Sequence, residues 1–152
     1  MSAQYDSRAD HLAHIHAVRD RLEIFAAELM RRGRVHDASK FSAEEKPVYD
    51  AVYPMLRGVA YGSAEWKAAV ERARPALDHH YQRNRHHPEY HAEGIAGMDL
   101  FDVVEMLCDW MAAAERNPAD GVRLDLNVTH YGIDKQLARI LENTLARWPV
   151  AL

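Results

Sequence analysis

Histidine is the residue type in this chain that most suggests chemistry. Ten of the 152 residues are histidines, and five of them lie between positions 79 and 91. Neutral imidazole is the commonest metal ligand in proteins, and its pKa of about 6.5 also suits proton transfer near neutral pH. The composition therefore makes metal binding or acid–base chemistry the first hypothesis.

A second signal is the adjacent pair His36 and Asp37, which opens the segment HDASKF. An imidazole and a carboxylate next to each other at the end of a helix can both reach one divalent ion. A surface pair or a helix cap would give the same dipeptide, so this pair needs further ligands to define a site. The single cysteine, Cys108, excludes an intramolecular disulfide and a thiolate metal cage.

Length and charge narrow the class of protein. With 48% hydrophobic and 28% charged residues, the chain fits one soluble domain over residues 1–152. Its 19 Lys and Arg against 23 Asp and Glu give a net charge of −4, which argues against long nucleic acid or an anionic membrane as partner. The N-terminal sequence lacks the apolar core of a secretory signal. We therefore expect a cytoplasmic protein.

Apolar residues spaced by three and four predict helices along almost the whole chain and no strand. A first helix is expected from about Ser7 to Arg32, ended by Gly33, with His14 at the edge of its buried stripe. Ser42 to Glu45 has the form of a capping box that opens a second helix. The expected fold class is an all-α bundle of about five to six helices. The buried stripe of the first helix comprises Ile15, Val18, Leu22, Phe25 and Leu29.

The middle of the chain is expected to carry the histidines on a helix and a loop. After a loop over 53–63, a third helix should be kinked at Pro75, and its apolar stripe places His80 toward the core and His79 away from it. Residues 83–97 are rich in His, Asn, Pro and Gly, which is typical of an ordered loop that carries a site.

Two further helices are expected over about 98–116 and 134–147. The apolar stripe of the first includes Cys108, which predicts an inert, buried thiol. The other face of this helix holds three carboxylates: Asp102, Glu105 and Asp109. An apolar tail of Trp148, Val150 and Leu152 favours a homodimer that would cover it.

The order His14, then His36-Asp37, then Asp109 on three separate helices resembles the ligand order of the HD superfamily of metal-dependent phosphohydrolases. The segment HDASK resembles that superfamily's central HDxxK motif, and the helical layout is similar to its five-helix core. Over nearly its whole length the chain also resembles an uncharacterised bacterial and phage family, a domain of unknown function. The motifs that carry this second resemblance are LAHI (12–15), HDASK (36–40), YGS (61–63), ALDHHY (76–81), NRHHPE (84–89), EMLCDW (105–110) and LENT (141–144).

The HD resemblance implies a divalent transition metal, Mn, Fe, Co, Ni or Zn, with four ligands: His14, His36, Asp37 and Asp109. Such an ion lowers the pKa of bound water and supplies a hydroxide that attacks phosphorus in line with the leaving group. Lys40 is then expected to bind the phosphate. Glu105 lies one helical turn before Asp109 and is a candidate to orient the water or a ligand histidine, with a solvated carboxylate as the alternative.

The histidine pairs at 79–80 and 86–87 leave three interpretations open. In the first, His80 and one histidine of the second pair bind a second ion that Asp37 bridges to the first. In the second, which the short spacing between the pairs favours slightly, one ion is bound and the phosphate and leaving group are handled by Asn84, Arg85, His86 and, as proton donor, His87. The third is a purely structural cluster.

Three functions are consistent with these residues. The first is a phosphohydrolase that acts on a small phosphorylated molecule, with a nucleotide as the leading candidate. The second is a diiron oxygenase, because some HD-fold enzymes use the same ligand order to activate oxygen. The third is a regulatory module that binds metal or nucleotide without turnover. Fold-level resemblance alone does not choose between them.

Overall fold

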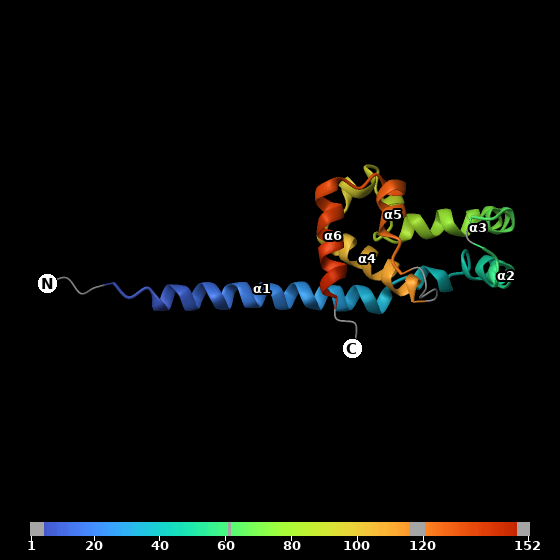
Figure 1. Ribbon diagram of the computed structural model, residues 1–152. Helices are drawn as coiled ribbons and strands as arrows, with labels where there is room; N and C mark the ends of the chain where they lie inside the picture. The colour runs from blue at the N-terminus through green and yellow to red at the C-terminus, as the bar shows by residue number, and fades with distance from the viewer. Residues whose placement is uncertain (1–4, 61, 116–120, 149–152) are drawn as a thin grey trace. The chain divides into compact units, whose positions relative to one another are not determined.

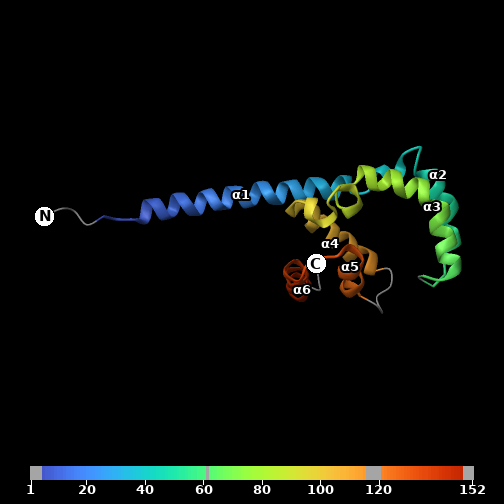
Figure 2. The same ribbon diagram turned by 90° about the horizontal axis from the view of Figure 1, so that it is seen from above.

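The computed structural model describes residues 5–60, 62–115 and 121–148. These residues form six α-helices, three short 3-10 helices and no strand, which confirms the predicted all-α class (Figures 1 and 2). The chain divides into two units, residues 1–35 and 36–152, and the single domain over 1–152 stays a prediction. In the described ranges, no helix is long and apolar enough to cross a membrane.

The first unit consists of one helix, α1 (Arg8–Val35). The helix continues through Gly33, where the sequence predicted its end. A glycine costs a helix only about 1 kcal/mol relative to alanine, and a helix of 28 residues can absorb that loss. A glycine without a proline or a strong cap after it is therefore a weak stop signal.

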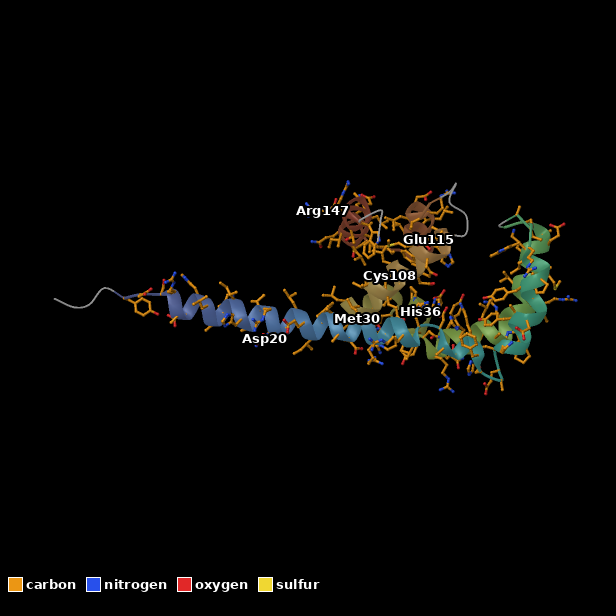
Figure 3. The ribbon with its side chains drawn as sticks, turned by 90° about the horizontal axis from the view of Figure 1, so that it is seen from below. Asp20, Met30, His36, Cys108, Glu115 and Arg147 are labelled. Carbon is orange, nitrogen blue, oxygen red and sulfur yellow. The ribbon has the colours of Figure 1, made fainter. Side chains whose placement is uncertain are left out.

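The apolar stripe predicted to be buried on α1 is not buried. No residue of α1 is buried: Ile15, Val18 and Leu22 are exposed, and Phe25 and Leu29 are half-buried. Met30 of the same helix is likewise exposed; Figure 3 draws the side chains of α1 as sticks. The physical reason is that a single helix has no second apolar surface within its own unit against which to pack.

The second unit begins with a helical pair, α2 (Lys46–Leu56) and α3 (Ala64–Arg83), which pack side by side. Pro47 lies in the first turn of α2, where its missing N–H breaks no helical hydrogen bond. The predicted start of the loop at Tyr53-Pro54 is wrong, because α2 continues through Pro54 to Leu56. Packing of this last turn against α3 offsets the one hydrogen bond that Pro54 removes.

A small apolar cluster holds α2 against α3. Val52 of α2 is buried against Ala69 and Ala73 of α3. Because the alanines are small, the two helix backbones can approach closely. Partly buried side chains complete the cluster: Val48, Leu56 and Leu77.

Short turns connect the helical pair to the rest of the second unit. The 3-10 helix η1 (Ala38–Phe41) precedes α2, and η2 (Pro88–Tyr90) and η3 (Gly94–Gly97) lie in the segment predicted as an ordered loop. A Cβ at Gly97 would lie 2.9 Å from the Cβ of His91, so the close approach of these two turns requires glycine.

Three helices form the C-terminal part of the second unit: α4 (Leu100–Ala114), α5 (Leu124–Tyr131) and α6 (Lys135–Arg147). Their core consists of Leu107, Leu124, Ile133 and Leu141. The sequence did not predict α5, which has only eight residues and becomes stable by packing its apolar side on this core. The helix expected over 98–116 begins later, and its predicted last residue lies outside the described residues.

Two details of this region correct the sequence analysis. Cys108 is exposed, because the stripe that packs on the core runs through Met106 and Leu107 instead. Trp148 is exposed as expected, but Val150 and Leu152 of the apolar tail lie outside the described residues. The homodimer therefore stays a prediction.

The C-terminal core predicts a contrast between two adjacent leucine-sized residues of α6. Leu141 is 2% exposed and Ile140 is 55% exposed. Leu141→Ala should lower the free energy of unfolding by about 2–5 kcal/mol because it leaves a cavity, whereas Ile140→Ala should change it by less than about 1 kcal/mol. Urea denaturation followed by circular dichroism measures both. Equal losses in the two variants would show that this core is placed wrongly.

Candidate functional site

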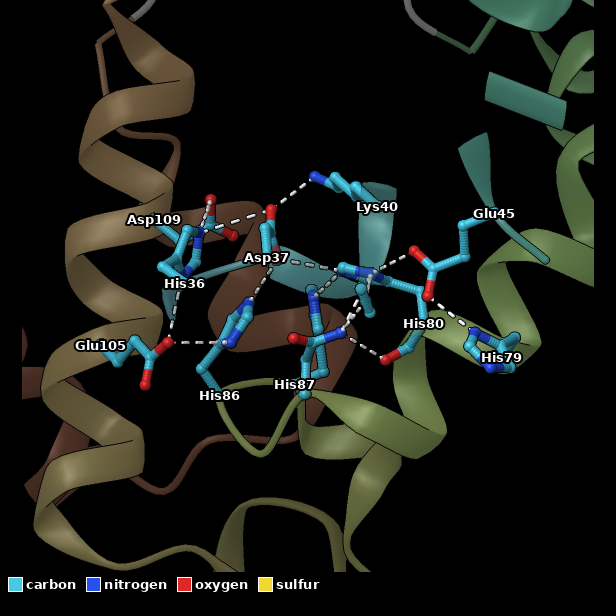
Figure 4. A network of polar contacts seen from close by, with 12 residues as sticks. His36, Asp37, Lys40, Glu45, His79, His80, His86, His87, Glu105 and Asp109 are labelled. Atoms are coloured by element: carbon cyan, nitrogen blue, oxygen red, sulfur yellow. Dashed lines mark hydrogen bonds and ion pairs between the residues drawn. The ribbon is translucent and has the colours of Figure 1, made fainter. Parts of the chain in front are cut away.

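Histidines and carboxylates from four parts of the second unit meet in one network (Figure 4). They come from the start of the unit, the residue before α2, the end of α3 with the loop that follows it, and one face of α4. The network comprises His36, Asp37, Lys40, Glu45, His79, His80, His86, His87, Glu105 and Asp109. Most of the predicted site residues of this unit are thus brought together.

Asp37 lies at the centre of the network and has an unusual backbone. Its φ of 56° and ψ of 17° are in the left-handed region, which costs a non-glycine residue roughly 1–2 kcal/mol and which aspartate tolerates better than most. Its carbonyl accepts a hydrogen bond from the Lys40 N–H at 2.9 Å. This turn directs the adjacent side chains of His36 and Asp37 toward one centre (Figure 4).

The two carboxylate oxygens of Asp37 face different partners. Oδ1 lies 3.1 Å from Nε2 of His80 and 3.5 Å from Nε2 of His86. Oδ2 lies 3.4 Å from Nε2 of His36 and accepts a hydrogen bond from Lys40 Nζ at 2.5 Å. Burial alone would raise the pKa of Asp37, but hydrogen bonds from His36, His80 and Lys40 outweigh it and lower the pKa.

Glu45 is a fully buried carboxylate that lies outside this centre and bonds to two histidines. Its Oε2 lies 2.9 Å from Nδ1 of His80, and its Oε1 lies 2.8 Å from Nδ1 of His79. Burial raises its pKa, but the bonds to both histidines lower it overall, so Glu45 is ionised and can only accept. Nδ1 of His80 therefore faces the Glu45 carboxylate as a donor, and its Nε2 is directed at Oδ1 of Asp37.

Glu105 orients two further histidines in the same way. Its Oε1 lies 3.0 Å from Nδ1 of His36 and 3.3 Å from Nδ1 of His86. Each Nδ1–H then points at Glu105, and each Nε2 points inward. Nε2 of His36 also lies 3.6 Å from Oδ1 of Asp109. This is the arrangement in which an outer carboxylate fixes the tautomer and orientation of a metal-binding histidine.

The pKa values of His36 and His87 are shifted in opposite directions. Hydrogen bonds to Asp109, Asp37 and Glu105 raise the pKa of His36 to about 11. Burial and the neighbouring His86 and His80 lower the pKa of His87 to about 3, so His87 is neutral. The Nε2 atoms of His87 and His80 lie 3.0 Å apart, which is the distance of a hydrogen bond. A cation bound by both nitrogens would take the place of the shared proton.

The donor atoms fit a divalent cation. Oδ1 of Asp37 and Nε2 of His86 are buried, lie 3.5 Å apart and form no hydrogen bond of normal geometry among the described residues. A cation satisfies such a pair, and imidazole with carboxylate suits Mn, Fe, Co, Ni or Zn. Three groups of residues could each hold one ion, because the ligand atoms within each group lie within 4.8 Å of one another. The groups are Asp37, His80, His86 and His87; His36, Asp37 and Asp109; and His36, His86 and Glu105.

Arg85 and Asn84, predicted to bind phosphate, make contacts that position the histidine loop. Arg85 forms two hydrogen bonds to the fully buried Asp102, from Nη2 at 2.8 Å and from Nε at 3.2 Å. Asn84 Nδ2 donates to Ser39 Oγ and to the His80 carbonyl, both at 2.8 Å. Their roles toward phosphate stay predictions, as do the catalytic roles of Lys40, Glu105 and His87.

His14 is the one predicted metal ligand that belongs to the first unit. It lies on α1 and is exposed. Its role as a ligand therefore stays a prediction.

The sequence analysis missed the role of Glu45, which it assigned to a helix cap. The N–H of Glu45 does donate to Ser42 Oγ at 3.2 Å, but the Glu45 side chain makes no capping bond and reaches His79 and His80 instead. One signal could have found it. Glu45 lies four residues before Tyr49 and seven before Val52, so it continues the buried stripe of α2 toward its N-terminus.

A comparison with protein families places the chain. A family model matches residues 3–147. The chain belongs to DUF5662, a family of unknown function. No curated protein and no solved structure matches it. The DUF5662 match confirms the expected membership in a domain family of unknown function, whereas no match links the chain to the HD superfamily.

In this DUF5662 chain, Glu45 should contribute to stability even without metal. Glu45→Gln keeps one acceptor oxygen but turns an amide N–H₂ toward the second histidine donor, so it should lower the free energy of unfolding by about 1–3 kcal/mol. The neighbouring Glu44 is exposed, and Glu44→Gln is the matched control. Urea denaturation of chelator-treated protein measures both variants. A Glu45→Gln protein as stable as the control would contradict the assigned contacts.

Proposed function

We propose that the protein is a metal-dependent phosphohydrolase with two divalent ions, one on each side of Asp37. The observation that carries this proposal is the position of the Asp37 carboxylate. Its Oδ1 faces His80 and His86, and its Oδ2 faces His36. Two ligand groups share this one residue, which favours two ions over the single ion that the sequence spacing slightly preferred.

The two ligand groups divide the donors between them. The first group is rich in imidazole and comprises Asp37, His80, His86 and His87; the second has more carboxylate and comprises His36, Asp37 and Asp109. When bound, the ions supply positive charge and a water molecule of lowered pKa. Glu45 and Glu105 hold the imidazoles with their Nε2 atoms inward, so the ligands are oriented before an ion arrives.

The chain's own residues supply the rest of the chemistry. Lys40 is partly exposed at the edge of the network, where its ammonium group pairs with Asp37 Oδ2 and is placed to bind a phosphate oxygen. In the reaction, a bond forms between the water oxygen and phosphorus, the bond between phosphorus and the ester oxygen breaks, and the leaving alcohol takes up a proton. A small phosphorylated molecule is the substrate class, and a nucleotide remains a candidate.

Metal content tests the two-ion arrangement. After incubation with Mn²⁺ and removal of unbound metal, the wild-type protein should hold about two ions per chain. Asp37→Ala should lose both ions, because the shared ligand is gone, and His86→Ala should lose about one. Elemental mass spectrometry measures the ratio, and incubation with Fe, Co, Ni or Zn shows which metal is preferred.

The matched control for metal binding is His130→Ala, which removes an exposed histidine of α5 outside the network. It should keep the wild-type metal content. A wild-type protein that binds none of the five metals would contradict the proposal. Loss of metal from the control as well would show that the binding is not specific to this network.

Phosphate release tests the reaction. The metal-loaded protein should release phosphate from at least one member of a panel of phosphate mono- and diesters and nucleotides. Glu105→Gln should reduce kcat by about 10- to 100-fold while most of the metal is retained, because it disturbs ligand orientation and not the ligands themselves. Glu115→Gln, at the exposed end of the same helix, should leave kcat unchanged.

Two outcomes would overturn the phosphohydrolase proposal. One is a fully metal-loaded protein that releases no phosphate from any member of the panel. The other is bound iron that supports oxygen consumption without phosphate release, which would favour the diiron oxygenase instead.

A further inference from the structure

A slot of about 190 Å³ lies between α2 and α3, directly beside the histidine–carboxylate network. Its walls are mainly apolar, with Val52 and Leu56 from α2 and Val70 and Leu77 from α3. Three members of the network, Lys40, His80 and His87, line the same slot. One cavity therefore joins the proposed phosphate-binding lysine and two proposed metal ligands with an apolar compartment.

The size of the slot limits what can occupy it. An apolar cavity of about 150 Å³ is enough to hold benzene. The slot can accordingly take one six-membered ring with a small substituent. Apolar pockets with a few polar groups at defined places are the usual form of small-molecule sites.

Tyr49 gives the slot a polar feature. It lines the slot and is only 7% exposed, and its hydroxyl is buried without a hydrogen-bond partner among the described residues. An unsatisfied buried hydroxyl is costly, and a ligand atom that donates to it or accepts from it would remove that cost. The Tyr53 ring stacks on Tyr49 at 5.5 Å with an interplanar angle of 14°, which fixes the orientation of the Tyr49 ring.

We propose that this slot binds the organic part of the substrate, a single ring that carries one hydrogen-bonding substituent. The inference rests on the phosphohydrolase function proposed above and makes the substrate a phosphate monoester of a small ring alcohol or phenol. In its hydrolysis, water and the ester give the ring alcohol and inorganic phosphate, with the water oxygen on phosphorus and a proton on the released ring oxygen. The phosphate lies at the end of the slot lined by Lys40 and the proposed metal ligands His80 and His87, and the apolar walls and Tyr49 face the ring.

Phosphonates that cannot be hydrolysed test the slot by binding alone. Isothermal titration of Mn²⁺-treated protein should give phenylphosphonate at least about tenfold higher affinity than methylphosphonate, because the slot buries the ring. Val70→Phe places a ring of its own in the slot and should abolish this difference without changing the affinity for methylphosphonate. Ala68→Phe, at an exposed position of the same helix, is the control and should keep the difference.

The hydroxyl of Tyr49 has a separate test that changes packing little. Tyr49→Phe should weaken the binding of 4-hydroxyphenylphosphonate by about three- to tenfold and leave the binding of phenylphosphonate unchanged. Thermal unfolding of each variant checks that it folds, and Tyr49→Phe still tests the slot if Val70→Phe does not fold. Equal effects on the two ligands would overturn the role of the hydroxyl.

The outcomes separate the slot from the reaction. In one outcome, the protein releases phosphate from esters but binds phenyl- and methylphosphonate equally, with no effect of Val70→Phe. The proposed role of the slot is then overturned and the phosphohydrolase function is supported. If Val70→Phe abolishes a preference for phenylphosphonate but no ester is hydrolysed, the slot is supported as a ligand site and the phosphohydrolase function is overturned.

Discussion

The arrangement of the site depends on two outer carboxylates, each of which faces the Nδ1 atoms of two histidines. Glu45 lies against His79 and His80, and Glu105 lies against His36 and His86. The Nε2 atoms of His36, His80 and His86 are then directed at the carboxylate of Asp37. Buried nitrogen and oxygen atoms gathered in this way need a proton or a cation between them. The carboxylates outside the centre thus determine the chemistry available within it.

Two separate apolar clusters keep these groups in place. The α2–α3 cluster around Val52 supports the end of α3, where His79 and His80 lie, and the C-terminal core around Leu107 supports α4, which carries Glu105 and Asp109. The segment with His86 and His87 connects these two parts. It is fixed by the hydrogen bonds of Arg85 to Asp102, a residue that also caps the start of α4. The network therefore lies where two packed regions meet, and neither region alone supplies all of its donors.

Local patterns predicted much of this arrangement, and contacts between distant residues account for what they missed. Helical periodicity predicted α3, α4 and α6 and the inward position of His80, because the residues involved are a few positions apart. The role of Glu45 depends on a partner 35 positions away, and its local context matched a cap equally well. The apolar stripe of α1, of which no residue is buried, shows the reverse case, since periodicity describes an amphipathic helix but not how far its apolar face is covered. The helix α5 and the turn through Pro54 were missed because packing outweighed weak local propensity.

The left-handed backbone at Asp37 links stability and the proposed metal chemistry at a single position. Glycine would adopt this conformation without strain, but it would remove the carboxylate that Lys40 pairs with and that two ligand groups share. The contacts that lower the pKa of Asp37 stabilise its charged form and offset the conformational cost of an aspartate at this position. Asparagine, which also tolerates this backbone, offers the mildest route by which a homologous chain could lose the charge yet keep the turn. Relatives that carry glycine or asparagine here would be expected to have kept the helical scaffold and given up the chemistry.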